Sequence, residues 1–381
     1  KDKKQNKRIN GGHRLLFFCI LCLFGLYVAV SYAEEQPQRE QSKTKVILLH
    51  TDNLTYDQYR HPGAQILTGN VQFQHDGVLM YCDSACFYEA TNSFDAFGHV
   101  KMVQGDTLDL VGDMLLYNGL DQLARVRHNV VLTHRESKLY TDSLDYDRLY
   151  ELGYFFEGGK LVDKDNVLTS DWGQYSPPTR QAVFNYNVKL ENPKFTLISD
   201  TLNYNTLTSM AEIVGPSNID SGDNHIYSES GFYNTQTEEA ILLDRSIVTN
   251  KGRKMVGDSL YYDSKSGVGA GFRNVVYTDE VNKNMLTGNY CYYNDSTGYS
   301  MATDSAVAID YSQRDTMYMH ADTFKVYTFY MDTDSMYREV RGYHKVRSYR
   351  MDVQSVCDSL VFDSRDTCIT MYRDPIVWNG G

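Results

Sequence analysis

A short phrase that returns about every 29 residues constrains the fold of this chain more than any other feature of its sequence. The phrase reads Asp, a small polar residue, Leu, any residue, Tyr, then Asp or Asn. Clear copies begin at Asp52, Asp142, Asp200 and Asp258, and weaker copies begin at Asp83, Asp113, Asp171, Glu229, Gly288, Asp322 and Asp358. From Asp113 to Asp258 the interval is 29 residues each time. Such self-similarity predicts an array of stacked supersecondary units.

The third and fifth positions of the phrase form two apolar columns. The fifth position is aromatic in ten of the eleven copies, as at Tyr146 and Tyr204, and the third is most often Leu, as at Leu144 and Leu202. Because side chains alternate between the two faces of a strand, the third and fifth positions share one face. Each repeat therefore presents an aliphatic and an aromatic side chain to the same side, while the sixth position suits a turn.

A second phrase follows the anchors after about 15 to 17 residues. It reads Gly69-Asn70-Val71-Gln72-Phe73 in one repeat and Arg273-Asn274-Val275-Val276-Tyr277 in another. Gly and Asn tolerate a positive φ and can open a strand after a turn. We therefore predict at least two strands in each repeat, no long helix after residue 45, and an all-β fold.

The N-terminus has the anatomy of a secretory signal peptide. Six basic residues precede or flank an apolar run from Leu15 to Val30, which ends at the small-x-small site Ser31-Tyr32-Ala33. We predict a signal peptide over 1–33, a polar linker over 34–44, and a continuous β-repeat array, one jellyroll or two fused ones, over 45–381. The chain begins at Lys1 and stops directly after a strand-like run, which is compatible with cuts from a longer product at both ends.

Charge and cysteine content exclude several classes. Removal of residues 1–33 takes six of 37 basic and one of 49 acidic residues, and leaves a formal charge of −17. Such a chain lacks the basic footprint needed to bind nucleic acid. Cys82 and Cys86 lie too far apart on one strand to bridge. Cys357 and Cys368 are placed to meet across a hairpin, but we favour free thiols.

The sequence carries none of the common catalytic motifs. It has no His-Glu-x-x-His, no Gly-x-Ser-x-Gly, no phosphate loop and no Gly-x-Gly-x-x-Gly. The repeated Asp supplies only one or two carboxylates in each turn, too few for a calcium loop, so its expected role is hydrogen bonding at strand ends. We expect no enzymatic activity, no cofactor and no metal.

At these two phrases the chain resembles the OstA/LptA family, the periplasmic bridge proteins of lipopolysaccharide transport, and the related N-terminal domain of the outer-membrane partner LptD. Residues 68–71 and 257–262 are the most similar passages, and the resemblance covers about residues 45 to 370. The chain departs from the family in being about twice as long and in being rich in Tyr. The greater length suggests one long bridge or two fused jellyrolls.

The resemblance implies a long twisted β-jellyroll, with a right-handed β-solenoid as the alternative fold. In this family two sheets form an open V whose apolar groove holds lipid A acyl chains and passes them outward. Carried over to this chain, the groove lining would be Leu54, Tyr56, Val71, Phe73, Val100, Met102, Leu115, Tyr117, Val130, Leu132, Leu144, Tyr146, Val188, Leu190, Leu202, Tyr204, Leu260 and Tyr262.

The resemblance also implies partners and a location. The partners would be lipopolysaccharide and other jellyroll components of the transport system, joined by pairing of edge strands. The location would be the periplasm of a Gram-negative bacterium, in association with the outer membrane. The alternative function is a non-catalytic β-solenoid scaffold or adhesin at the cell envelope. An open groove at the third and fifth positions favours lipid transfer, whereas a solid core favours a scaffold.

Overall fold

A computed structural model describes residues 44–331, 333–366 and 368–380 of the chain. The predicted signal peptide and nearly all of the linker lie outside these residues. No helix in the described ranges is long and apolar enough to cross a membrane. The first fourteen strands and one 3-10 turn are β1 (Ile47–His50), β2 (Asn53–Tyr56), β3 (Gln65–His75), β4 (Val78–Tyr88), η1 (Glu89–Thr91), β5 (Ser93–Gln104), β6 (Leu108–Asn118), β7 (Leu123–His134), β8 (Ser137–Asp147), β9 (Leu152–Asp163), β10 (Asn166–Ser176), β11 (Gln181–Asn192), β12 (Phe195–Asn205), β13 (Met210–Ser221) and β14 (Asn224–Asn234).

The remaining strands continue the same pattern to the end of the described chain. They are β15 (Glu239–Leu243), β16 (Ile247–Asn250), β17 (Arg253–Val256), β18 (Ser259–Asp263), β19 (Val268–Asp279), β20 (Asn284–Asn294), β21 (Tyr299–Asp310), β22 (Met317–Phe329), β23 (Tyr337–Arg350), β24 (Val353–Asp363), β25 (Cys368–Tyr372) and β26 (Ile376–Asn379).

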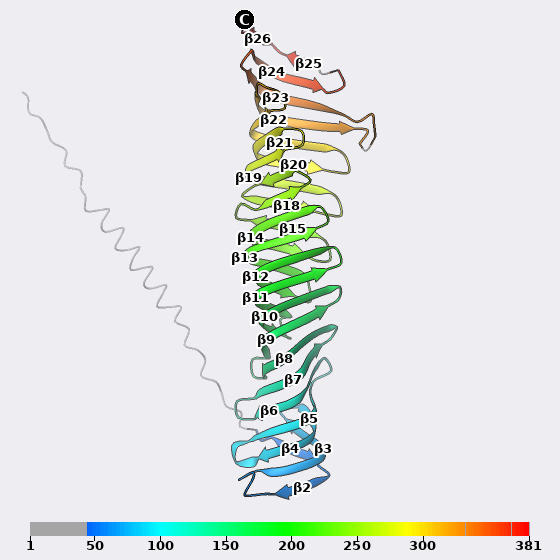
Figure 1. Ribbon diagram of the computed structural model, residues 1–381, viewed down its shortest axis with the longest axis vertical. Coiled ribbons are helices and arrows are strands. Elements are labelled where there is room, and N and C mark those ends of the chain that lie inside the picture. The colour runs from blue at the N-terminus through cyan, green and yellow to red at the C-terminus, as the bar shows by residue number, and fades with distance from the viewer. Residues whose placement is uncertain (1–43, 332, 367, 381) are drawn as a thin grey trace, which may run out of the picture. The chain divides into compact units, whose positions relative to one another are not determined.

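The strands form one antiparallel meander. Each long strand pairs with the strand before it and the strand after it, as β12 does with β11 and β13. The short strands act in pairs as single broken strands: β1 and β2 both pair with β3, and β15 and β16 both pair with β14. Each repeat thus adds two antiparallel strands to a stack that runs from β2 to β26 (Figure 1). The all-β prediction is confirmed, and the choice between a jellyroll and a solenoid stays a prediction.

Each long strand bends at its middle, at a place we call the corner. In β3, Gly69 and Asn70 have φ values of 84° and 47°, and the pairing register with β4 shifts between Thr68 and Val71. Two residues with positive φ oppose one residue of the next strand, which is a β-bulge that turns the strand. A Cβ at Gly69 would lie 2.3 Å from Oδ2 of Asp52, so this close approach requires glycine.

The two sequence phrases meet at the corner. The Asp that opens one phrase accepts a hydrogen bond from the Asn or His side chain of the other phrase, and this pair closes the bulge. The repeated Asp therefore has a structural role, as expected, although it acts at a bend within the strand and not at a strand end. The donor and acceptor pairs are Asn70–Asp52 (3.0 Å), His99–Asp83 (2.7 Å), Asn129–Asp113 (2.6 Å), Asn187–Asp171 (2.6 Å) and Asn274–Asp258 (2.7 Å).

Two kinds of turn join the strands. The long turns stack in a column at one end of the strands, and the short turns stack in a column at the other end. The sixth position of the phrase begins the longer turn: Asn205 Oδ1 accepts hydrogen bonds from the backbone N–H groups of Leu207 and Thr208. Backbone bonds then join one long turn to the next, as from Thr235 N–H to Ser209 C=O. We call this column of turns the long-turn rim. The column of short turns at the other ends of the strands, such as residues 164–165, is the short-turn rim.

One repeat was placed in the wrong register by the sequence columns. The copy that we began at Gly288 assigns Tyr290 and Tyr292 to the inner face. In the structure β20 pairs Gly271 of β19 with Cys291, which is buried, whereas Tyr290 and Tyr292 are part-exposed on the other face. The true anchor is Asn289, and a slip of one residue reverses the face of every side chain in a strand.

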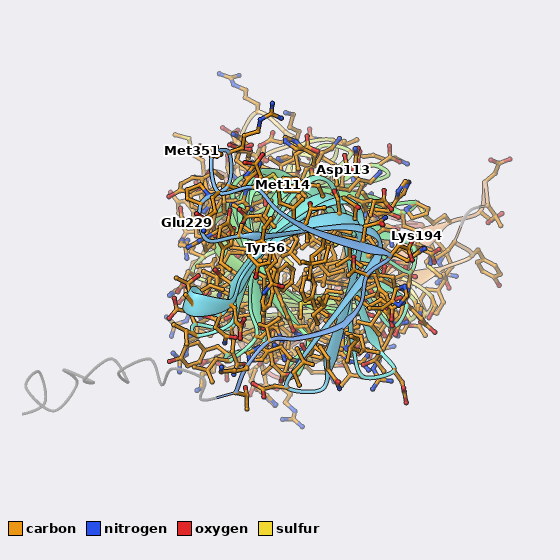
Figure 2. All side chains as sticks on the ribbon, turned by 90° about the horizontal axis from the view of Figure 1, so that it is seen from below. Tyr56, Asp113, Met114, Lys194, Glu229 and Met351 are labelled. Atoms are coloured by element: carbon orange, nitrogen blue, oxygen red, sulfur yellow. The ribbon has the colours of Figure 1, made fainter. Side chains whose placement is uncertain are left out.

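Two hydrophobic cores lie inside the stack. The larger core runs from Val46 to Leu260, and the smaller one from Val275 to Leu360. We call residues 44–262 the N-terminal part and residues 263–380 the C-terminal part. Figure 2 looks along the stack from the end where β2 lies, with Tyr56 labelled on that strand.

Candidate functional site

Most of the predicted groove residues lie in the larger core and are shielded from solvent. Fifteen of the eighteen are buried, and Leu144, Leu202 and Tyr204 have 0% of their surface exposed. Leu54 and Tyr56 are 46% and 64% exposed, because β2 is an edge strand with no neighbour beyond it, and Tyr262 is part-exposed. The structure therefore brings the predicted residues onto one inner face, and it packs that face closed over most of the N-terminal part.

A seam of polar contacts holds the N-terminal part closed. It joins the short-turn rim to the long-turn rim, on the side of the stack opposite the corners. At its centre Tyr204, next to a long turn, donates a hydrogen bond to Asp163, next to a short turn (2.7 Å). Asn166 Nδ2 donates to both the Tyr204 hydroxyl and Thr235 Oγ1, each at 2.9 Å.

The same kind of contact recurs along the N-terminal part. His75 Nδ1 lies 2.7 Å from the Tyr117 hydroxyl, and Arg148 also donates to that hydroxyl. Other members of the seam are Val46–Asn92 (2.7 Å), Gln104–Glu151 (2.7 Å), Gln122–Asp76 (3.0 Å), His134–Tyr175 (2.8 Å), Lys164–Ser209 (3.0 Å) and Lys194–Glu238. These contacts all join residues between 44 and 238.

Burial in the seam shifts the protonation of its side chains. Burial lowers the pKa of His75 and of His134, so both imidazoles are held neutral. Burial likewise raises the pKa of Tyr204, and the neighbouring Asp163 carboxylate adds to the shift. The phenol therefore keeps the proton that it donates across the seam.

The inner face of the C-terminal part is packed differently. Close to the corner its side chains are buried, as at Val275, Ala302 and Phe324. Farther from the corner they are part-exposed. We call these part-exposed residues the open inner face: Tyr277, Leu286, Tyr293, Ala308, Met319, Val326, Val340, Ser348 and Phe362. Leu286, Ala308 and Met319 pack against the smaller core, which places them on the inner side.

Side-chain size explains why this face is not closed. Ala302, Ala306 and Ala308 of β21 occupy the positions that Val126, Val130 and Leu132 fill in β7, where all three are buried. Gly271 and Gly342 stand at equivalent positions of β19 and β23. Small side chains do not span the space between the two inner faces, so the outer portion of that space stays accessible.

The hydrogen bonds of the rims also differ in the C-terminal part. Those found for the described charged residues near its turns stay within one rim, as between Lys283 and Glu280 (3.2 Å) and between Arg350 and Asp352 (2.5 Å). Asp279 has a lowered pKa despite its burial, because backbone and side-chain donors from Asn282 and the nearby Arg253 stabilise its carboxylate. The hydrogen bonds of these charged groups therefore do not tie the two rims together.

Family membership follows from the sequence match to known proteins. The model of the family described as OstA-like protein matches residues 43–200 and 195–258, more than half of the chain. This chain belongs to the OstA-like family. The match covers nearly all of the N-terminal part and ends at residue 258, so the C-terminal part of this OstA-like protein lies beyond it.

Among solved structures, the OstA-like chain is similar to LptH from Pseudomonas aeruginosa, described as the LptA homologous periplasmic component of the conserved lipopolysaccharide transport device. The two sequences are 16% identical, and the alignment covers 32% of this chain and 82% of the other, with a TM-score of 0.27. No functionally curated protein matches the chain.

Sequence reasoning missed the open inner face because it weighed residue type without residue volume. The inner columns continue through the C-terminal part of the OstA-like chain, so they give no sign of a change. A usable signal was the run of Gly and Ala at inner positions from Gly269 to Gly342. The register error at Gly288 hid it further, since it placed two large Tyr side chains inside.

The described residues of the OstA-like chain hold no group of three His, Cys, Asp or Glu side chains arranged to bind a metal ion. Cys82, Cys86, Cys291, Cys357 and Cys368 are free thiols. Burial raises the pKa of Cys82 to about 12, which makes it a poor nucleophile near neutral pH.

Proposed function

We propose that this OstA-like protein is a non-catalytic lipid carrier of lipopolysaccharide transport, and that acyl chains lie against the open inner face. The part-exposed apolar lining around Leu286 and Met319 is the observation that carries this proposal. Each methylene removed from water contributes about 0.8 kcal/mol, so several methylenes of one acyl chain suffice for stable binding. The mixture of Leu, Met, Val and Tyr lining suits a flexible hydrocarbon rather than a rigid ligand.

The lining residues predicted from the sequence have a second place in this proposal. Val71, Phe73, Leu144, Leu202 and the other buried candidates would contact lipid only after the seam separates. Acyl chains would therefore enter between the rims of the C-terminal part first, where the inner face is already accessible. Passage farther along the stack would require the hydrogen bonds at Tyr204 and Tyr117 to break in turn.

A second candidate function, a filled scaffold, is favoured by the closed core of the N-terminal part. Side chains such as Leu132, Leu190 and Leu202 are completely buried, and the buried seam beside them is hydrogen-bonded. A solid beam of this kind spaces two binding partners without holding a ligand. The two candidates assign different parts of the molecule to different tasks, and one experiment separates them.

The proposed location is the periplasm, and the proposed partners are other jellyroll components of the transport system. Apolar side chains on the edge strands support pairing with another sheet. Ile47 and Leu49 are 54% and 48% exposed on β1, and Val377 and Trp378 are 55% and 50% exposed on β26. Unpaired backbone groups on such strands favour the addition of a further strand.

Photocrosslinking tests the lipid proposal directly. A photoreactive phenylalanine analogue at Leu286 or Met319 should crosslink to lipopolysaccharide in cells, because both side chains line the open inner face. The matched controls are Thr287 and His320, which adjoin them in the same strands and face the opposite side. Crosslinks at Tyr204 would show that lipid also enters the N-terminal part.

The outcomes separate the two functions. Crosslinks at Leu286 and Met319 but not at Thr287 and His320 support the carrier. If all four positions give the same background signal in a folded protein, the carrier proposal fails and the scaffold remains. Native mass spectrometry of the purified chain, with and without added lipopolysaccharide, supplies an independent readout of the bound lipid.

A further inference from the structure

The outer face of the C-terminal part carries a cluster of aromatic rings that packing does not require. Tyr290 and Tyr292 of β20 point away from the inner face, since Cys291 between them is buried inside. Tyr299 of β21 and Tyr327 of β22 lie on the same outer side. Each is three positions along its strand from a buried inner residue, Ala302 or Phe324, and so faces the opposite way. All four Tyr side chains are part-exposed.

The rings form two contacting groups on this face. Tyr292 and Tyr299 have ring centroids 6.0 Å apart, and Tyr299 and Tyr327 are 5.2 Å apart, with their planes inclined by 49° and 48°. Phe272 of β19 adjoins Tyr290 at 5.2 Å. We call this set the outer aromatic face, and it comprises Phe272, Tyr290, Tyr292, Tyr299, Tyr327 and Tyr343.

Two cations lie on the same surface. The Arg341 guanidinium lies 5.0 Å from the ring centroid of Tyr327, and Lys325 Nζ lies 5.5 Å from that of Tyr343. Lys325 and Arg341 face each other directly across β22 and β23. The acidic Glu339 is paired with Arg341, so the cluster carries a net positive charge in a chain whose formal charge is −12.

The geometry of this surface restricts what it can bind. Its strands lie inside the sheet, each paired on both sides, so no free backbone edge is available for strand addition. From β19 to β23 the rings extend over four strand spacings, about 19 Å at 4.8 Å each. The surface is long, shallow, aromatic and hydroxyl-bearing, and contiguous exposed apolar surface of this kind marks an interaction site.

We propose that the outer aromatic face binds an acidic oligosaccharide. The C–H faces of pyranose rings would pack on the Tyr rings, whose polarised faces attract C–H groups, while the phenol hydroxyls exchange hydrogen bonds with sugar hydroxyls. Lys325 and Arg341 would pair with carboxylate or phosphate groups on the sugars. The acidic remainder of the chain repels such a ligand elsewhere and so confines it to this face. This inference does not depend on the lipid proposal.

A protein partner fits these observations less well. The buried centre of a protein interface is depleted in Lys, whereas Lys325 lies beside the rings. The rings are inclined to one another by 49° and 48°, which suits small ring-shaped units more than a flat protein surface. Burial and the adjacent phenols raise the pKa of Tyr299, so its hydroxyl stays uncharged near neutral pH.

An array of bacterial oligosaccharides, with equal numbers of acidic and neutral members, tests the proposal on the full chain. We expect acidic members to be retained, with affinity then measured by calorimetry for the best of them. The triple variant Tyr292→Ala, Tyr299→Ala, Tyr327→Ala should bind at least ten times more weakly. The matched control, Phe97→Ala, Tyr140→Ala, Phe232→Ala, removes exposed aromatics from the N-terminal part and should bind normally.

A single charge reversal keeps the test decisive if the triple variant does not fold. Lys325→Glu should weaken the acidic ligand at least tenfold and make its binding less dependent on salt, while circular dichroism stays unchanged. The proposal is overturned if no acidic glycan is retained, if neutral glycans bind equally well, or if folded Lys325→Glu binds as the parent does. It is also overturned if the triple variant keeps its affinity for the acidic glycan but loses binding to a protein.

Discussion

The N-terminal and C-terminal parts share one backbone design and differ in what fills it. Both are antiparallel meanders that bend at an Asp-bonded corner, and in both the side chains nearest the corner are buried. In the N-terminal part large inner side chains and a polar seam close the remaining space. In the C-terminal part small inner side chains leave it accessible, and a further cluster of aromatic residues lies on the outer face.

The difference separates architecture from function within one repeat. The corner and the turns recur in both parts, so they account for the stack but not for any binding site. Access to the interior depends on two features that differ between repeats. They are the volume of the inner side chains and the polar residues on the rims. Family membership rests on the closed part, whereas the features best suited to ligands lie in the part beyond the match.

The largest expected effect comes from placing a charge in each interior. Leu202→Asp should cost at least about 4 kcal/mol of unfolding free energy, because it buries an unpaired carboxylate in a closed core. Leu286→Asp, on the open inner face, should cost about 1 kcal/mol, since water reaches the new carboxylate. Urea unfolding followed by circular dichroism measures both. Equal costs would remove the contrast between the two parts.

This result also changes how lipid binding is tested. The double variant Leu144→Asp, Leu202→Asp is the obvious way to block the predicted groove, but it should unfold the N-terminal part. Lipid capture should instead be tested with Leu286→Asp, with Thr287→Asp on the outer side of the same strand as control. Only the first should lose captured lipid, by about tenfold, while both stay folded.

The next effect concerns the seam. Tyr204→Phe removes the donor to Asp163 and the acceptor of Asn166, so it should cost about 1 to 3 kcal/mol. Tyr146→Phe is the matched control, because the buried Tyr146 hydroxyl has no hydrogen-bond partner in the described structure. Its loss should change stability by less than about 0.5 kcal/mol, or increase it. Indistinguishable thermal midpoints for the two variants would contradict the role of the seam.

Acid should weaken the seam. Burial lowers the pKa of His75, whose neighbours include Asp76 and Arg148, and of His134, which lies near Arg135 and Arg180. A folded-state pKa below about 6.5 means that the unfolded chain binds more protons, so stability is lost as pH falls below that value. Thermal melts from pH 7.5 to 5 should show this loss. The variant His75→Gln, His134→Gln should show a shallower pH dependence, and an identical slope would rule out the two imidazoles.

The smallest effect should be the same in both parts. Asp171→Ala removes the acceptor of a corner hydrogen bond in the N-terminal part, and Asn289→Ala removes the donor of the corner hydrogen bond to Asp304 in the C-terminal part. Each should cost about 0.5 to 1 kcal/mol, because exposed hydrogen bonds contribute little. Chemical denaturation of the two variants checks the equality. A much larger cost in one part would mean that the corners differ after all.

The repeat phrases predicted the strands, the turns and the inner columns, because period and residue type determine which face a side chain takes. They did not predict the corner. The hydrogen bond from Asn187 to Asp171 joins two adjacent strands, and the sequence pattern alone does not show which residues of those strands lie opposite each other. The seam was also out of reach: Asn166 and Thr235 are 69 residues apart and meet only because the two rims converge.

The candidate site was predicted only in part. The columns correctly placed Leu144, Leu202 and Tyr204 on the inner face, but alternation cannot distinguish a closed face from an open one. The aromatic outer face escaped notice because two inserted residues, in the turn at 280–283, lengthen the interval from Asp258 to Asn289 to 31 residues and hide the true register. In a Tyr-rich strand such as β20, either set of alternating residues could face the core. The buried Cys291 between Tyr290 and Tyr292 shows which set does.

Thiol labelling tests most directly the claim that one part is closed and the other accessible. In a background of Cys86→Ser and Cys368→Ser, a single cysteine replaces either Leu202 or Leu286, and a small maleimide is added under native conditions. The account predicts that the thiol at 286 reacts about 100-fold faster or more, because labelling at 202 requires an opening of about 3 kcal/mol. Equal labelling rates at the two positions in folded protein would contradict it.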